Sequence, residues 1–187
     1  MNGQMMFFLI AVFVFAAILG VLMFRGIASS RRRSQTPWQN LIAQLAETDH
    51  SALELLAKHT SNRDASSVLD DEQTLPPEEV WRMVGGMKGL ELLDHNSKVM
   101  IAMAAYVHEW HPVASSEAEE LRMIGREIEW HVNRLRAAER AANLESWFGN
   151  YAENTAAAYC LMAERLLHFC EAARLPRPML SELQRAL

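Results

Sequence analysis

The first 36 residues have a hydrophobic pattern unlike that of the rest of the chain. From Met5 to Phe24, twenty consecutive residues carry no charge, and thirteen of them are Phe, Leu, Ile or Val. As a helix at about 1.5 Å per residue, this run is about 30 Å long, which matches the hydrocarbon thickness of a bilayer. We therefore predict a single-pass transmembrane helix. Its anchoring positions include Phe7, Phe13, Leu19 and Gly20.

A cleaved signal peptide is the main alternative for this segment. Such a peptide has a basic start, an apolar core of about 7 to 15 residues and a small-residue cleavage site. Here residues 2–4 carry no side-chain charge, the apolar run is too long, and the small residues 28–30 lie between arginines. The pattern therefore favours an anchor that stays attached.

All side-chain charge near the apolar run lies on its C-terminal side. These charges belong to Arg25, Arg31, Arg32 and Arg33. Because Lys and Arg are retained in the cytoplasm, we predict that the N-terminus is outside and the remaining chain inside, a topology that best suits a bacterial inner membrane. The same arginines are predicted to contact lipid headgroups.

Two small residues in the apolar run bear on self-association. Ala16 and Gly20 form a small-xxx-small pair, which lets two membrane helices pack closely. Such pairs are common in any apolar run, and a lipid-facing role is the simpler interpretation. A homo-oligomer therefore stays open as an alternative.

The charge balance changes after residue 36. Four of the 18 basic residues and none of the 23 acidic ones precede this point, which leaves 14 basic against 23 acidic groups, a net charge of −9, in residues 37–187. An acidic body with a basic collar does not have the charge of a nucleic-acid binder. About 150 residues suffice for one domain with a core. We predict an anchor in residues 1–36 and one soluble domain in residues 37–187.

The soluble part has a helical pattern throughout. Apolar residues recur at spacings of three and four, and strand-type runs of Val, Ile and Thr are missing. This predicts an all-α bundle of about five to six helices. The clearest stripes run from Ser116 nearly to Gly149 and from there to Pro176, which predicts a long antiparallel hairpin near the C-terminus. Residues 60–75 are rich in Ser, Asp and Asn and are predicted as a mobile loop.

Three short segments predict where helices begin or break. A helix starts at Pro37 and passes through Leu45, and Asp49 either breaks it or lies within it. Pro76-Pro77 starts the next helix. The polar residues 94–97 predict an interruption before a helical face that includes Trp110.

Residues 85–89 (GGMKG) are the glycine-rich stretch of the chain. Phosphate-binding loops are glycine-rich because backbone N–H groups must approach the anion. No Walker pattern and no preceding strand accompany these glycines. A hinge, or a close approach between helices, is therefore favoured over anion binding.

Seven histidines raise the question of a metal or cofactor site. Glu127/His131 and Glu164/His168 stand four residues apart on adjacent helices, as in metal-binding bundles. On a helical wheel, however, His131 falls within the apolar arc of its helix, whereas His168 lies opposite its own arc. They do not converge on one ion. His131 is better explained as a core or rim histidine that pairs with Glu127 than as a ligand or base.

His108 and His111 lie three residues apart near a helix end. Such a pair holds a transition metal only if further ligands arrive from elsewhere. Two surface histidines near a helix C-terminus are the simpler interpretation. We therefore predict no metal or cofactor and keep His131, Glu127, His108 and His111 as candidate ligands.

The tryptophans indicate a surface for a protein partner. Trp130 lies nearly opposite the apolar stripe of its helix, and Trp81 and Trp147 lie to the side of theirs. Exposed aromatic residues mark partner surfaces, although a second layer of helices is an alternative way to cover them. The two cysteines, Cys160 and Cys170, are about 15 Å apart if they share one helix, which predicts free thiols.

Two classes of function follow from these patterns. The first is a membrane-anchored cytoplasmic adaptor or accessory subunit that binds other membrane or cytoplasmic proteins. The second is a sensor or enzyme whose bundle holds a metal, haem or small ligand at His131 with His95, His108 or His111. The first is favoured because no nucleophile, base or phosphate motif is evident.

Overall fold

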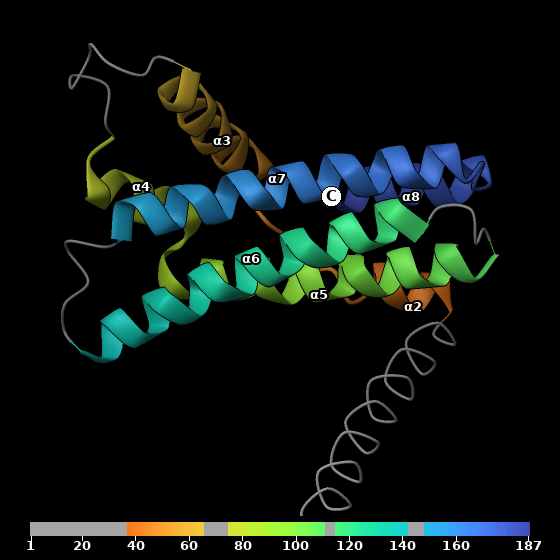
Figure 1. Cartoon of the computed structure of the whole chain (residues 1–187), viewed down its shortest axis with the longest axis horizontal. Coiled ribbons are helices and arrows are strands. Elements are labelled where there is room, and N and C mark those ends of the chain that lie inside the picture. Colours follow the sequence, from red (N-terminus) through yellow and green to blue (C-terminus); the bar gives the residue numbers. More distant parts are fainter. Residues whose placement is uncertain (1–36, 66–74, 111–114, 142–147) are drawn as a thin grey trace, which may run out of the picture. The chain divides into compact units, whose positions relative to one another are not determined.

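The computed structural model describes residues 37–65, 75–110, 115–141 and 148–187. In these residues all regular structure is helical, which confirms the predicted all-α bundle (Figure 1). Pro37–Leu187 form one compact unit. The predicted anchor and its arginines lie outside the described residues. Within the described ranges, no helix combines the length and the apolar character needed to cross a bilayer.

Seven helices lie in the described part of the chain. They are α2 (Trp38–Ile42), α3 (His50–Ala65), α4 (Pro77–Val84), α5 (Gly86–Trp110), α6 (Ser115–Arg140), α7 (Phe148–Ala172) and α8 (Arg177–Ala186). Helix α7 is central, because it packs against α3, α4, α5, α6 and α8. Small residues such as Ala152 and Ala156 are fully buried along it and let neighbouring helices approach closely.

Helices α6 and α7 form the predicted antiparallel hairpin (Figure 1). Leu121, Ile128 and Leu135, spaced by seven residues along α6, are all buried. The turn was predicted at Gly149, which lies instead within α7; residues 142–147 lie outside the described residues. Helix α6 ends at Arg140, and Gly149 is the second residue of α7.

Helices α4 and α5 meet at two glycines in left-handed conformations. Gly85 has φ 75° and caps α4, and Gly86 has φ 66°. At Gly89, one turn into α5, a Cβ atom would collide with the carbonyl oxygen of Val84. Glycine is needed here because the two helix ends touch through their backbones. The predicted close approach between helices is thereby confirmed.

Helix α5 runs without a break through residues 94–97, so the predicted interruption was wrong. The reason is Asn96, whose buried side chain forms hydrogen bonds through both its amide oxygen and its amide nitrogen. Its Oδ1 accepts a hydrogen bond from the backbone N–H of Ala46 (2.8 Å), and its Nδ2 donates to the Ala46 carbonyl (2.8 Å) and to the Tyr159 hydroxyl (3.2 Å). The polar residue therefore holds the α2–α3 connection against α5 and α7.

The α2–α3 connection starts earlier than predicted, because α2 ends at Ile42 rather than passing through Leu45. Asp49 separates the two helices: its carboxylate accepts hydrogen bonds from the Ser51 hydroxyl (2.7 Å) and the Ala52 N–H (3.2 Å). These bonds, led by that from Ser51, lower the pKa of Asp49. At its other end α3 includes residues 60–65, which were predicted as loop; residues 66–74 lie outside the described residues.

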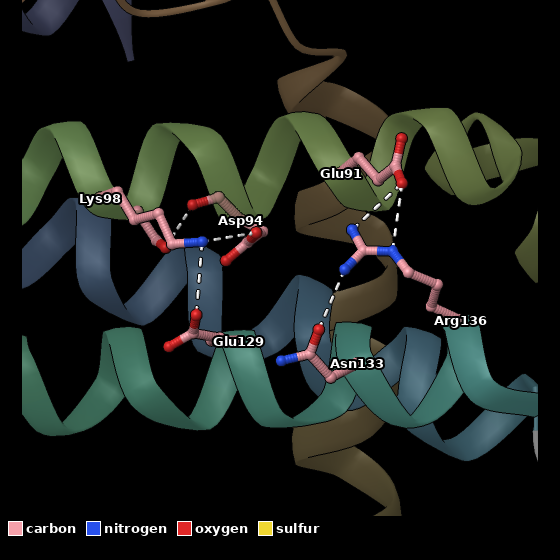
Figure 2. Close-up of polar contacts among 7 residues, drawn as sticks. Glu91, Asp94, Lys98, Glu129, Asn133 and Arg136 are labelled. Atoms are coloured by element: carbon pink, nitrogen blue, oxygen red, sulfur yellow. Dashed lines mark hydrogen bonds and ion pairs between the residues drawn. The ribbon is translucent and has the colours of Figure 1, made fainter.

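Two cross-helix ion pairs join α5 to α6 (Figure 2). Lys98 pairs with Glu129 (3.4 Å), and Arg136 pairs with Glu91 (3.1 Å). Lys98 also pairs with Asp94 of its own helix at 2.9 Å, and this hydrogen bond is the main cause of its raised pKa. Seven residues separate the partners on each helix, in opposite chain order, as antiparallel helices require.

We predict that Asn96→Ala destabilises residues 37–187 by about 2–4 kcal/mol, because it leaves the N–H and C=O of Ala46 without their partner. Urea denaturation at pH 7.5 measures the change. Asn133→Ala is the control: this exposed residue only accepts from Arg136 of its own helix (3.0 Å), and its loss should cost no more than about 0.5 kcal/mol. Equal effects of the two substitutions would contradict the role of Asn96.

We also predict that Gly89→Ala destabilises the body by about 2 kcal/mol or more, since α4 must move away from α5 to admit the methyl group. At Gly149 a Cβ atom has nothing within 4 Å, so Gly149→Ala should be neutral or stabilising by up to about 0.5 kcal/mol. Thermal denaturation of both variants tests the pair. A tolerated alanine at position 89 would refute the backbone contact.

Candidate functional site

Three rings gather where α6 and α7 pack together. Trp130 and His131 of α6 have ring centroids 5.0 Å apart, and Tyr151 of α7 lies 5.6 Å from Trp130 and 5.4 Å from His131. The Trp130–Tyr151 planes meet at 65°, an edge-to-face arrangement. Side chains held in this way lose little conformational freedom when a partner binds.

Trp130 remains at the surface, as its position on the helical wheel predicted. It is 48% exposed although two rings contact it. The guanidinium carbon of Arg134, one turn later on α6, lies 5.0 Å from the centroid of the Trp130 ring. This is cation–π geometry. The surface thus presents an indole with a positive charge beside it. We call Trp130, His131, Arg134 and Tyr151 the α6 aromatic cluster.

His131 forms the buried side of the α6 aromatic cluster. Its Nε2 lies 3.7 Å from Glu127 Oε1, which is an ion-pair distance for a protonated ring but too long for a good hydrogen bond. Its Nδ1 is buried and has no hydrogen-bond partner. Burial lowers the pKa of His131, and the Glu127 carboxylate opposes that shift without cancelling it. The lowered pKa favours the neutral imidazole at neutral pH.

The candidate metal ligands do not assemble into a site within the described ranges. His131 and Glu127 are adjacent, but no group of three or more His, Cys, Asp or Glu side chains is placed to hold an ion there. His108 is partly buried on α5, and its Nδ1 has no hydrogen-bond partner. His111 lies outside the described residues. His95 is bonded to the Gln44 carbonyl at 3.0 Å.

The other tryptophans have different surroundings. Trp81 lies edge-on against Phe148, with centroids 4.1 Å apart, and a Cβ atom on Gly86 would come within 3.1 Å of its ring. Trp81 therefore packs the α4–α5 junction against α7. Trp147 lies outside the described residues. Trp110, expected on the apolar face of its helix, is 69% exposed, because α5 extends beyond its last buried residue, Val107.

The cysteines are free, as predicted, and they are poor nucleophiles. Burial raises the pKa of Cys160 to about 11 and that of Cys170 to about 12. A thiol reacts as its thiolate, and both groups are protonated at neutral pH. Neither side chain supports a thiolate-based activity.

A cavity of about 450 Å³ lies beside the glycine-rich stretch. It is lined by Gly85, Gly89, Arg82 and Lys88 as well as by the carboxylates of Glu47 and Asp49, among others. The two acidic groups offset the charges of Arg82 and Lys88, so the cavity has no net positive charge to attract an anion. The glycines are accounted for by the contact between α4 and α5.

Comparison of the chain with protein-family models, with curated proteins and with solved structures finds no match.

The buried imidazole predicts a dependence of stability on pH. Because the pKa of His131 is lower in the folded protein than its ordinary value of 6.5, the unfolded chain binds more protons below that pH. The stabilisation is complete above about pH 6.5 and is lost as the pH falls below it. Urea denaturation at pH 7.5 and 5.5 should show a smaller loss for His131→Gln than for the wild type.

Glu127→Gln should change the loss of stability between pH 7.5 and 5.5 in the opposite direction from His131→Gln. Removal of the carboxylate removes the interaction that raises the pKa of His131, so the pKa falls further and the acid-dependent loss of stability grows. A larger loss in Glu127→Gln together with a smaller one in His131→Gln is the expected outcome. The reverse order would refute the assignment.

Proposed function

We propose that this chain is a membrane-anchored helical adaptor, which holds a partner protein at the cytoplasmic face of the inner membrane. The observation that carries the proposal is the half-exposed Trp130 in the α6 aromatic cluster. Residues that dominate binding energy at protein interfaces are enriched in Trp, Tyr and Arg, and these three residue types meet here.

The geometry of the cluster favours binding of an apolar pocket with an acidic rim. The rings of His131 and Tyr151 pack against the indole of Trp130. A partner that binds the indole therefore gains contact area without having to order a flexible side chain. Arg134 places a positive charge at the edge of that contact. Met123, two turns earlier on the same face of α6, is 57% exposed and extends the apolar strip.

The membrane address is inferred from the sequence. The uncharged run from Met5 to Phe24 and the arginines that follow it have the pattern of an anchor with its soluble domain inside the cell. An adaptor needs only a tether and a binding face, and the acidic helical body supplies a rigid support for that face.

One observation favours the second class of function. The Nδ1 atom of His131 is buried without a hydrogen-bond partner, and such a nitrogen is able to bind a ligand or a metal. Under this alternative the bundle is a sensor or enzyme that uses core histidines. Metal analysis and an absorption spectrum of the purified protein distinguish the classes: a stoichiometric metal or a haem band supports the alternative.

We expect Trp130→Ala to reduce crosslinked capture of the partner from native membranes at least tenfold, because truncation of a central tryptophan typically costs about 2 kcal/mol or more. The melting temperature should stay within a few degrees of the wild type. Leu161→Ala is the control: this side chain on α7 is 42% exposed and should leave capture unchanged.

Arg134→Gln provides a milder variant at the same surface. Removal of the charge beside Trp130 should weaken capture less than removal of the ring. Normal capture by both variants would refute an interface at the α6 aromatic cluster. Loss of the fold in Trp130→Ala would show that the ring acts in packing.

A further inference from the structure

A second exposed aromatic surface lies at another place on the bundle, where the end of α5 meets the α7–α8 turn. An apolar cavity of about 250 Å³ there is lined by Tyr106, Val107, Trp110, Arg174, Leu175, Pro176 and Met179. Trp110 at its edge is 69% exposed. The indole of a tryptophan combines an apolar ring with a polar N–H. It therefore favours a boundary between apolar and polar surroundings.

The turn between α7 and α8 carries two positive charges although the body as a whole is acidic. Residues 172–181 contain Arg174 and Arg177 and are bordered by Glu171 and Glu182, whereas residues 37–187 carry a net charge of −9. Both arginines are exposed. The turn itself is therefore better suited to an anionic surface than the rest of the acidic body is.

Arg174 occupies a backbone position that usually belongs to glycine. Its φ is 54°, the left-handed conformation that ends α7, and the N–H of Leu175 donates to the Cys170 carbonyl at 3.1 Å. An arginine at this position accepts a backbone strain that glycine would avoid. Its side chain borders the apolar cavity beside Trp110.

The described chain begins at this same end. Trp38, the first residue of α2, packs against Tyr106 with ring centroids 5.9 Å apart, and α2 contacts α8. Figure 1 shows α2 beside the C-terminal part of α5. Twelve residues separate the apolar run, which ends at Phe24, from Pro37, and a chain of that length spans at most about 40 Å. An anchored body therefore keeps this end near the bilayer.

We propose that this surface, formed by Tyr106, Trp110, Arg174, Leu175, Arg177 and Met179 and named here the α5–α8 surface, rests on the anionic lipid of the membrane. The Trp110 ring lies at the boundary between headgroups and acyl chains, and Arg174 and Arg177 contact lipid phosphates. A short tether gives a high effective concentration, so weak contacts suffice. The inference rests on the proposed membrane anchor and adds an orientation to it.

The test uses the full-length chain reconstituted into vesicles. The vesicles contain phosphatidylglycerol and phosphatidylcholine with brominated acyl chains, which quench nearby tryptophan fluorescence. The signal of Trp110 is obtained as the difference between wild type and Trp110→Phe. We expect brominated lipid to reduce this difference signal at least twofold. The corresponding signal of Trp130, obtained from Trp130→Phe, should change little.

Charge and lipid composition provide further controls. In the double variant Arg174→Gln and Arg177→Gln, or in phosphatidylcholine alone, quenching of the Trp110 signal should fall at least twofold, because the electrostatic attraction is removed. Vesicle flotation distinguishes failure of the proposed anchor from failure of the α5–α8 contact alone. Protein that floats without quenching of Trp110 overturns only the α5–α8 contact, whereas protein that fails to float overturns the anchor as well. Trp110-dependent self-association without quenching would assign the surface to a second copy.

Discussion

The two hydrogen bonds between the Asn96 amide and the backbone of Ala46 are the interaction on which the arrangement of the bundle depends. They attach the α2–α3 connection to α5, and the third bond, to Tyr159, ties the same point to α7. Helix α2 is thereby held near the end of α5, and the start of α3 is placed where the helix packs against α7. A helix of five residues is too short to be stable by itself, so α2 depends on tertiary contacts such as this one.

The sequence predicted features that depend on one helix or on neighbouring residues. The all-α class, the α6–α7 hairpin and the close approach at the glycine-rich stretch follow from spacing and from backbone preference. The continuity of α5 did not, because Asn96 resembles a helix breaker until its partner, 50 residues away, is known. The same holds for Asp49, whose capping role depends on where α2 ends.

The residues of the candidate site likewise fall into two groups: those whose exposure one helix predicts, and those that depend on the tertiary structure. The wheel located Trp130 correctly because exposure of a residue on a long helix depends mainly on the face of that helix. It failed for Trp110, since the wheel does not show where the core ends along the axis. Arg174 had no sequence signal at all, because a left-handed arginine cannot be distinguished from one within a helix. The partner of Trp81 likewise comes from another helix.

The spacing of the two ion pairs between α5 and α6 decides which alignments of these helices are tolerated. Displacement of α6 by one heptad in one direction would place Glu91 opposite Glu129 and Lys98 opposite Arg122. Displacement in the other direction would bring Lys98 to Arg136. Exposed ion pairs contribute little to stability, but like charges in direct opposition are unfavourable. The apolar residues repeat every seven positions, so a shift of one heptad would still bring apolar residues together. The charged residues disfavour that shift because it opposes like charges.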